Sequence, residues 1–265
     1  MRLQDSTVLL TGATGGIGQA IARALDERGA RVLLTARRTE QLDQVAAALG
    51  GRPLVLPADL TDAAEAAALA ERAGAVDVLV ANAALPASGP IDEFSPEQID
   101  RALDVNLRAP IQLTRALLPG MVERGSGHVV LVSSLAGKVA SVGSSLYSAT
   151  KFGLRGFAAG LREDLHGSGV GVTVVFPGFV SGAGMFAEAG VALPRGVGTR
   201  TPKQVAQAVV RGIEEGRAEI DVAPLGLRAG ALLSSLAPVT AARIQRRLGS
   251  AELSAALAEG QRPKR

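Results

Sequence analysis

The sequence predicts an α/β protein whose parallel sheet is covered by helices on both faces. Short apolar runs rich in Val and Leu recur along the chain, as expected of buried strands. Alanine-rich segments separate these runs, and a parallel sheet needs such helical crossovers between its strands. The chain has 265 residues, which is long enough for one large domain with a sizeable core.

The predicted elements alternate in chain order. Apolar runs predict strands over 7–11, 31–35, 53–57, 77–81, 128–133, 171–176 and 218–222. Helices are expected over 19–28, after residue 60, from 95 toward 121, after 147 and from 201. Ser95 and Gln98 have the spacing of a capping box with Pro96 at the first helical position, so the third of these helices begins there.

Composition excludes several function classes. The 28 basic and 25 acidic residues leave a net charge of only +3, which argues against a nucleic-acid partner. The chain has no cysteine, and its two histidines, His128 and His166, argue against a zinc site, so we expect no bound metal. No signal peptide is recognisable and no uncharged apolar run reaches transmembrane length. We therefore expect a soluble, cytoplasmic protein.

A glycine-rich turn over 12–18 joins the first strand to the first helix. Its spacing is G-x-x-x-G-x-G rather than the commoner G-x-G-x-x-G. Glycines let the backbone approach a pyrophosphate, which the positive end of the following helix attracts. Because the turn stands between a strand and a helix, a dinucleotide site is favoured over a simple turn.

The end of the second strand favours NADP(H) over NAD(H). An NAD site usually offers a carboxylate there to the ribose 2′-hydroxyl, but this chain has Ala36. Arg37 and Arg38 follow, and a guanidinium suits a 2′-phosphate. Arg37 is the first candidate and Arg38 the second. The alternative is that both arginines are solvated residues at a helix start.

Three polar side chains are expected to meet after the fifth strand. Ser134 follows that strand, and Tyr147 and Lys151 are four residues apart on one helical face. The ammonium should lower the pKa of the phenol toward neutrality, so that Tyr147 exchanges a proton with a carbonyl oxygen held by Ser134. A cofactor must supply the hydride. The alternative, a half-buried core tyrosine, is disfavoured because the serine and the glycine turn accompany it.

Pro110 falls inside the predicted helix that starts at residue 95. Since proline has no N–H, the carbonyl of Asn106 loses its helical partner and could hold a water in the cleft. Residues 82–84, after the fourth strand, are small enough for a cofactor ribose to pass close to the backbone.

Two segments depart from the strand–helix alternation. Residues 179–200 are rich in glycine and alanine and predict a mobile substrate lid, with Met185 and Phe186 as candidate substrate contacts; the alternative is an ordered loop without a gating role.

Residues 223–259 mix leucines with arginines and predict a helical extension that lies on a partner subunit, on the lid or on a membrane surface. Packing on its own domain or on a subunit is favoured. Disorder is expected over 260–265.

Together these motifs resemble the short-chain dehydrogenase/reductase family over roughly residues 7–222. The matching positions are Thr11, Gly12, Gly16, Gly18, Asp59, Leu60, Asn82, Ala83, Val105, Asn106, Leu107, Ser134, Tyr147, Lys151, Pro177 and Gly178. The resemblance implies one Rossmann-type catalytic domain over 1–222 with strand order 3-2-1-4-5-6-7. The chain departs from the family pattern at Ala84, where glycine is usual, and at Gly182, beside Ser181, where a carboxamide-binding threonine is common.

The resemblance also implies the roles of the site residues. Tyr147 would be the catalytic acid/base, Lys151 would bind the nicotinamide ribose, and Ser134 would orient the carbonyl. Asn106 would hold a water in a proton relay, and Asp59 would touch the adenine. The cofactor site implied in this way comprises Gly12, Thr14, Gly15, Gly16, Ile17, Gly18, Arg37, Arg38, Asp59, Leu60, Asn82, Ala83, Ala84, Tyr147, Lys151, Pro177, Gly178 and Val180.

We therefore expect an NADP(H)-dependent oxidoreductase that interconverts a ketone or aldehyde and an alcohol. A non-catalytic NAD(P)-binding sensor or scaffold is disfavoured because the tyrosine and the lysine are both present. A peripheral membrane enzyme acting on lipid carbonyls is suggested only by the C-terminal extension. An apolar small-molecule substrate is suggested by Leu85, Leu135, Val142, Leu146, Met185 and Phe186.

A homodimer or homotetramer is the expected assembly, because the family usually associates through two long helices. A stripe of small residues in the helix that carries Tyr147 would permit close helix approach, or would pack on the chain's own sheet. The stripe consists of Ala149, Gly153, Gly156 and Gly160.

Overall fold

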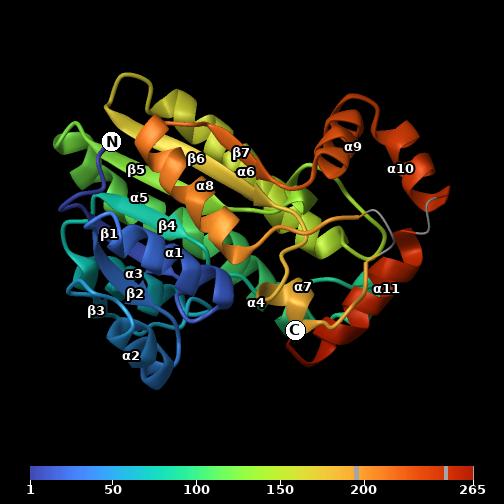
Figure 1. The fold of residues 1–265 in the computed structure, drawn as a ribbon, viewed down its shortest axis with the longest axis horizontal. Helices are drawn as coiled ribbons and strands as arrows, with labels where there is room; N and C mark the ends of the chain where they lie inside the picture. The colour runs from blue at the N-terminus through green and yellow to red at the C-terminus, as the bar shows by residue number, and fades with distance from the viewer. Residues whose placement is uncertain (194–196, 248–249, 265) are drawn as a thin grey trace.

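A seven-stranded parallel sheet forms the centre of the computed structural model, which describes residues 1–193, 197–247 and 250–264. The strand order is β3-β2-β1-β4-β5-β6-β7, and helices cover both faces (Figure 1). This is the predicted Rossmann-type fold. The order reverses between β1 and β4, so ligands are expected at the carboxyl ends of the strands around this point.

The seven predicted strands are all present, with β3 reduced to two residues between Pro53 and Pro57. The strands are β1 (Thr7–Thr11), β2 (Arg31–Thr35), β3 (Leu54–Val55), β4 (Val78–Ala81), β5 (Gly127–Val132), β6 (Val170–Pro177) and β7 (Glu219–Val222). Two predicted helices begin with complete capping boxes, Ser95 with Gln98 and Thr201 with Gln204.

The helices connect these strands and extend beyond the last of them. The α-helices are α1 (Gly16–Asp26), α2 (Thr39–Ala47), α3 (Ala63–Ala73), α4 (Pro96–Leu103), α5 (Ala109–Glu123), α6 (Ser145–Asp164), α7 (Gly184–Glu188), α8 (Pro202–Glu215), α9 (Leu225–Leu236), α10 (Pro238–Arg247) and α11 (Ser250–Gln261). Short helical turns are η1 (Ile91–Glu93), η2 (Asp104–Arg108), η3 (Leu135–Gly137) and η4 (Arg262–Lys264).

The hydrophobic core has one layer on each face of the sheet, because alternate strand residues point to opposite faces. Leu9 and Leu79 pack in a cluster with residues of α3, α5 and α6. Val8 and Val78 pack in the other cluster, with residues of α1, α2 and α8. These two layers hold the central strands in place, so that their carboxyl ends form one stable edge.

The single helix predicted from residue 95 toward 121 contains a π-helical turn just before Pro110. The π-helical turn η2 separates α4 from α5, and the N–H of Ala109 donates to the carbonyl of Asp104, five residues back. The wider turn occurs where Pro110 cannot donate to the carbonyl of Asn106. Asn106 is fully buried there.

The predicted lid segment and the C-terminal extension pack on each other. Residues 184–188 of the lid form α7, and α11 contacts α7 (Figure 1). The predicted lid residues 194–196 lie outside the described part of the chain. The sequence predicts disorder over 260–265, whereas in the structure residues 260–264 form the end of α11 and the turn η4. Gln261 is buried at the end of α11, and Arg262 pairs with Glu93 at 3.0 Å, while residue 265 is not described.

The described ranges 1–193, 197–247 and 250–264 lack two features. No helix in them has both the length and the apolarity to cross a bilayer. No group of three acidic or histidine side chains in them is arranged to hold a metal ion.

The small-residue stripe of α6 is partly used within the chain, since a Cβ at Gly153 would lie 3.0 Å from Leu107, whereas Gly156 and Gly160 face open space. Oligomerisation stays a prediction.

His128 is a buried structural histidine between β5 and β6. Its Nε2 lies 2.8 Å from the hydroxyl of Thr173, and that hydroxyl donates to the carbonyl of Arg217 at 2.6 Å. Because threonine has a single hydroxyl hydrogen, Nε2 must carry the proton and donate to Thr173. Burial lowers the pKa of His128 from 6.5 to about 4.

We expect His128 to make the free energy of unfolding depend on pH. Between pH 6.5 and 4 the unfolded chain binds a proton that the native imidazole does not, so stability falls as the pH is lowered through this window. The difference amounts to about 3 kcal/mol. Urea unfolding at both ends of the window should show a smaller loss for His128→Gln than for the wild type. The exposed His166→Gln is the control, and an equal loss in all three proteins would contradict the prediction.

Candidate active site

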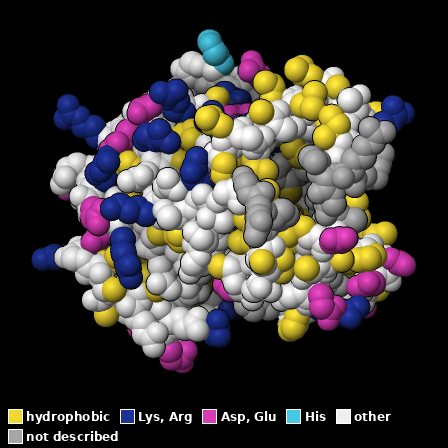
Figure 2. All heavy atoms as spheres, turned by 45° about the vertical axis from the view of Figure 1, so that its right-hand side comes forward, with side chains coloured by type: hydrophobic (Ala, Val, Ile, Leu, Met, Phe, Trp, Pro, Cys, Tyr) yellow, Lys and Arg dark blue, Asp and Glu magenta, His cyan; other side chains and the backbone are white. Residues whose placement is uncertain are grey.

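A cavity of about 1350 Å³ lies at the carboxyl ends of β1, β2, β4, β5 and β6. Ordinary small-molecule pockets measure about 300–1,000 Å³, so this one has room for a large cofactor and a second ligand. The glycine turn, the lid and the C-terminal helices form its walls. Hydrophobic side chains gather around the hollow in Figure 2.

Every sequence-predicted site residue except Asn106 lines this cavity. The predicted substrate contacts divide: Leu85, Leu135, Met185 and Phe186 line the cavity, whereas Val142 is exposed and Leu146 is buried elsewhere. The site residues brought together are Gly12, Thr14, Gly15, Gly16, Ile17, Gly18, Arg37, Arg38, Asp59, Leu60, Asn82, Ala83, Ala84, Ser134, Tyr147, Lys151, Pro177, Gly178 and Val180.

The glycine turn leaves space for a phosphate group. A Cβ at Gly12 would lie 2.8 Å from the backbone of Ala83, and one at Gly18 would lie 2.1 Å from the carbonyl of Gly12, so close packing requires these two glycines. At Gly15 the nearest atom is 3.6 Å away. Helix α1 begins at Gly16, and its N-cap residue Gly15 provides no side-chain cap, so the first N–H groups of the helix can bind an anion. The turn therefore fits a dinucleotide pyrophosphate.

Asn82 fastens the end of β4 to the end of β1. Its Nδ2 donates to the carbonyls of Thr11 and Gly12 at 3.1 and 3.2 Å, and the hydroxyl of Thr11 accepts from the N–H groups of Asn82 and Ala83 at 3.0 and 3.1 Å. These bonds hold the glycine turn against residues 82–84. The side chain of Asn82 thus shapes the cofactor side of the cavity.

Two arginines and one carboxylate border the predicted adenosine end of the cavity. Arg37 and Arg38 are exposed after β2, and Arg38 also borders an adjoining polar hollow with Arg23. The carboxylate of Asp59 accepts hydrogen bonds from the N–H and the hydroxyl of Thr61 at 3.0 and 2.9 Å. The two exposed guanidiniums are free to meet an added phosphate.

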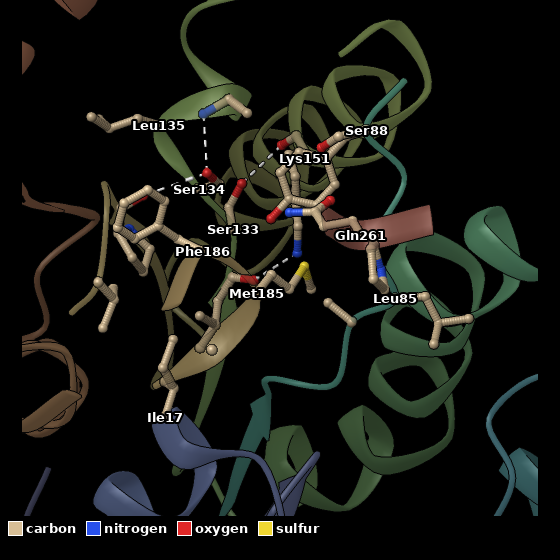
Figure 3. Close-up of a pocket in the computed structure, with 18 of the residues that line it drawn as sticks. Ile17, Leu85, Ser88, Ser133, Ser134, Leu135, Lys151, Met185, Phe186 and Gln261 are labelled. Carbon is tan, nitrogen blue, oxygen red and sulfur yellow. Dashed lines mark hydrogen bonds between the residues drawn. The ribbon is translucent and has the colours of Figure 1, made fainter. Parts of the chain in front are cut away.

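Ser134, Tyr147 and Lys151 all line another part of the cavity, and Figure 3 shows Ser134 and Lys151 there. The Nζ of Lys151 lies 5.6 Å from the centre of the Tyr147 ring and donates to the carbonyl of Val132 at 3.1 Å. Ser133 donates to the carbonyl of Lys151 at 3.0 Å, which joins α6 to the end of β5. The hydroxyl of Ser134 accepts from an N–H of η3 at 3.2 Å.

Burial controls the protonation of this group. It raises the pKa of Tyr147 to about 12, against a hydrogen bond with Ser134 that lowers it. Burial also lowers the pKa of Lys151 to about 8. The lysine is expected to lower the pKa of the phenol toward neutrality, but in the structure burial raises this pKa by more than the hydrogen bond with Ser134 lowers it. Near pH 7 the phenol is protonated and the ammonium is mostly charged.

Asn106 supports the site from outside the cavity. Its Oδ1 accepts from the N–H of Leu85 at 2.6 Å and its Nδ2 donates to the carbonyl of Leu85 at 2.9 Å. Both amide atoms are therefore occupied, and Leu85 is held at the cavity wall. A water relay at Asn106 would have to use the main-chain carbonyl, and this role stays a prediction.

The position of the usual carboxamide-binding threonine has no equivalent side chain here. Gly182 has a left-handed φ of +74°, and the neighbouring Ser181 donates both its N–H and its hydroxyl to the carbonyl of Arg200, at 2.9 and 3.4 Å. Ser181 does not line the cavity. Ser181 therefore does not replace the carboxamide-binding threonine that is missing at Gly182.

Sequence reasoning missed the C-terminal wall of the cavity. The repeated leucines indicated an amphipathic extension, but nothing in their spacing showed which surface it covers. The residues contributed by this wall are Gly226, Leu227, Gly230, Ala231, Leu233, Ala241, Ile244, Leu253, Ser254, Leu257, Gln261 and Pro263.

Comparison with known proteins agrees with this architecture. The profile of the short chain dehydrogenase family matches residues 6–192. The ketoacyl reductase HetN of Nostoc sp. is 40% identical over 83% of this chain and 79% of its own length. The NADP-dependent 3-hydroxy acid dehydrogenase YdfG of Salmonella typhi is 41% identical over 66% of this chain and 73% of its own length.

A solved structure shows that the similarity extends to the three-dimensional fold. The short-chain dehydrogenase of Sphingobium yanoikuyae in complex with NADPH superimposes with a TM-score of 0.77 and 30% identity, over 89% of this chain and 95% of that one. The matched profile spans the glycine turn, Ser134, Tyr147 and Lys151 in one stretch. The chain therefore belongs to the short-chain dehydrogenase/reductase family of NAD(P)-dependent oxidoreductases.

Proposed function

We propose that the protein is an NADP(H)-dependent oxidoreductase that interconverts a ketone or aldehyde and the corresponding alcohol. The observation that carries the proposal is the meeting of Ser134, Tyr147 and Lys151 in the cavity onto which the glycine turn opens. A bound nicotinamide dinucleotide supplies or accepts the hydride. The chain's own residues bind that dinucleotide, orient the carbonyl and move the proton.

The preference for NADP(H) rests on charge. The uncapped start of α1 suits the pyrophosphate, and Arg37 and Arg38 offer two exposed guanidiniums where an acid would favour NAD(H). The relative YdfG is named as NADP-dependent, and the Sphingobium structure holds NADPH. Both names support the same cofactor for this chain.

The proton moves through Tyr147. With a pKa of about 12 the phenol is protonated at neutral pH and can donate to an alkoxide oxygen, which is a stronger base than phenolate. Ser134 donates a hydrogen bond to the same oxygen, and the charge of Lys151 stabilises the phenolate that remains. Lys151 is buried and Ser134 and Tyr147 are partly buried, which limits the access of bulk water to these bonds.

The names of the relatives favour an oxo- or hydroxy-acyl substrate, and that of YdfG favours an oxygen function at the third carbon. HetN is named as a ketoacyl reductase and YdfG as a 3-hydroxy acid dehydrogenase. A non-catalytic sensor has no observation in its favour, because both the phenol and the ammonium are in place. The membrane-peripheral variant is favoured by four exposed apolar side chains of α9 and α10, Leu225, Leu232, Leu236 and Val239, and would use the same chemistry.

Tyr147→Phe tests the proposed reaction directly. Removal of the phenolic proton should lower kcat for carbonyl reduction by about 10²–10⁴-fold, with little change in the KM for NADPH. Initial rates on a panel of 3-oxo esters, followed by NADPH absorbance, measure both values. Thr150→Ser, in the next turn of α6 and away from the cavity, is the control. Turnover retained in Tyr147→Phe would remove the tyrosine from its assigned role.

Arg37→Ala tests the cofactor preference. Loss of a charged hydrogen bond to the 2′-phosphate should raise the KM for NADPH by about tenfold or more and leave the KM for NADH nearly unchanged. Arg31→Ala, at the amino end of β2 and away from the cavity, should change neither value. A wild-type protein with the lower KM for NADH would refute the preference.

Tyr147 can be titrated alone because the chain has one tyrosine and no tryptophan. At pH 10 an ordinary tyrosine is half ionised, whereas a phenol with a pKa near 12 should be only about one-hundredth ionised. The ultraviolet absorbance of phenolate measures this fraction, and circular dichroism checks that the protein is still folded. Half-ionised tyrosine in the folded protein would show that burial does not control this group.

A further inference from the structure

The C-terminus is held over the substrate side of the cavity by two contacts. A Cβ at Gly260 would lie 2.6 Å from the carbonyl of Ala189, so α11 packs directly on the backbone after lid helix α7. Arg262 pairs with Glu93 of η1 at 3.0 Å. Leu253 and Leu257 of α11 line the cavity between these contacts. The end of the chain is therefore a wall of the pocket.

Gln261, the last residue of α11, is the polar exception in this wall. Its side chain lines the cavity although the residue is only 7% exposed. Its Oε1 is buried and accepts no hydrogen bond from any residue in the described part of the chain. The other such atom there, the hydroxyl of Thr35, belongs to β2 inside the sheet. A buried amide oxygen is normally hydrogen-bonded, so the oxygen of Gln261 requires a partner.

The orientation of the Gln261 side chain indicates that the hydrogen-bond partner of its oxygen is the substrate. Figure 3 shows Gln261 extending from the C-terminal segment into the pocket, while Ile17 of the glycine turn lies on the opposite side of the view. Leu85 and Met185 line the same pocket and provide no donor. Other polar side chains also line this pocket, among them Ser88, Ser141 and Ser254, but none in the described part of the chain donates to the amide oxygen of Gln261. The carbonyl of the substrate would lie at the Ser134, Tyr147 and Lys151 group.

We infer that Gln261 is a specificity-determining residue whose amide oxygen accepts a hydrogen bond from an O–H or N–H group of an otherwise apolar carbonyl substrate. The inference rests on the proposed function for the position of that carbonyl. The donor group pairs with Gln261, and the apolar remainder packs on Leu253, Leu257 and Met185. A substrate without the donor leaves the buried oxygen unpaired and binds more weakly.

Two compounds that differ by one donor test this assignment. N-Benzylacetoacetamide carries an N–H where benzyl acetoacetate carries an ether-type oxygen, and both have the same 3-oxo group and ring. Calorimetric titration in the presence of NADP⁺, which cannot reduce either ketone, measures the two Kd values. Turnover of both compounds with NADPH is recorded in parallel.

The variants separate the acceptor from the rest of the wall. Gln261→Met keeps the length of the side chain and removes the oxygen, Gln261→Ala is a second removal, and Gln261→Glu restores an acceptor. Ser254→Ala is the matched control, because it removes a different pocket oxygen from the same helix. Thermal unfolding of each variant verifies the fold.

We expect the ratio of the ester Kd to the amide Kd to fall about three- to tenfold in Gln261→Met and Gln261→Ala, and to be retained in Gln261→Glu and Ser254→Ala. An unchanged ratio in both removal variants, an equal fall in Ser254→Ala, or binding of neither compound would overturn the inference. Turnover with an unchanged ratio refutes only the role of Gln261. A changed ratio without turnover in the wild type refutes only the proposed reaction.

Discussion

The site depends on a buried ammonium that is tied to the end of a strand. Lys151 is only 2% exposed, and in the described residues no carboxylate pairs with it. Its Nζ donates to the carbonyl of Val132 while Ser133 donates to the carbonyl of Lys151, so α6 and β5 are joined in both directions. A buried charge is costly unless it is hydrogen-bonded, which makes this junction the least replaceable contact of the pocket. Tyr147, one helical turn earlier, takes its position from it.

The walls of the cavity form one connected series from the start of the chain to its end. A Cβ at Gly16 would lie 2.3 Å from the Cβ of Ala183, so the glycine turn touches the lid, and Gly260 touches the backbone of Ala189 on the far side of α7. The cofactor side and the substrate side therefore share the lid as a common wall. Any displacement of α7 must change both sides together, since neither contact leaves room for an added methyl group.

Local patterns predicted most of the fold and most of the site. The order of strand, turn and helix along the sequence located the glycine turn. The four-residue spacing of Tyr147 and Lys151 placed both on one face of α6. The sequence could not show that desolvation dominates the pKa of Tyr147, because burial is a property of the whole packed site. Gln261 was missed for a related reason. A glutamine near a polar chain end has no local signature, and only the packing of α11 on the lid brings it into the cavity.

The direction of the pKa shifts bears on how the site handles a proton. A phenol at about 12 is a reluctant acid toward water, but an alkoxide formed by hydride addition is a stronger base and takes the proton readily. Alcohol oxidation would have to start from phenolate, which burial disfavours and which the hydrogen bond with Ser134 and the neighbouring charge of Lys151 would stabilise. That charge weakens as the pH approaches the lysine pKa of about 8. In the proposed reaction these shifts favour carbonyl reduction near neutral pH, because they leave the phenol protonated and the ammonium mostly charged.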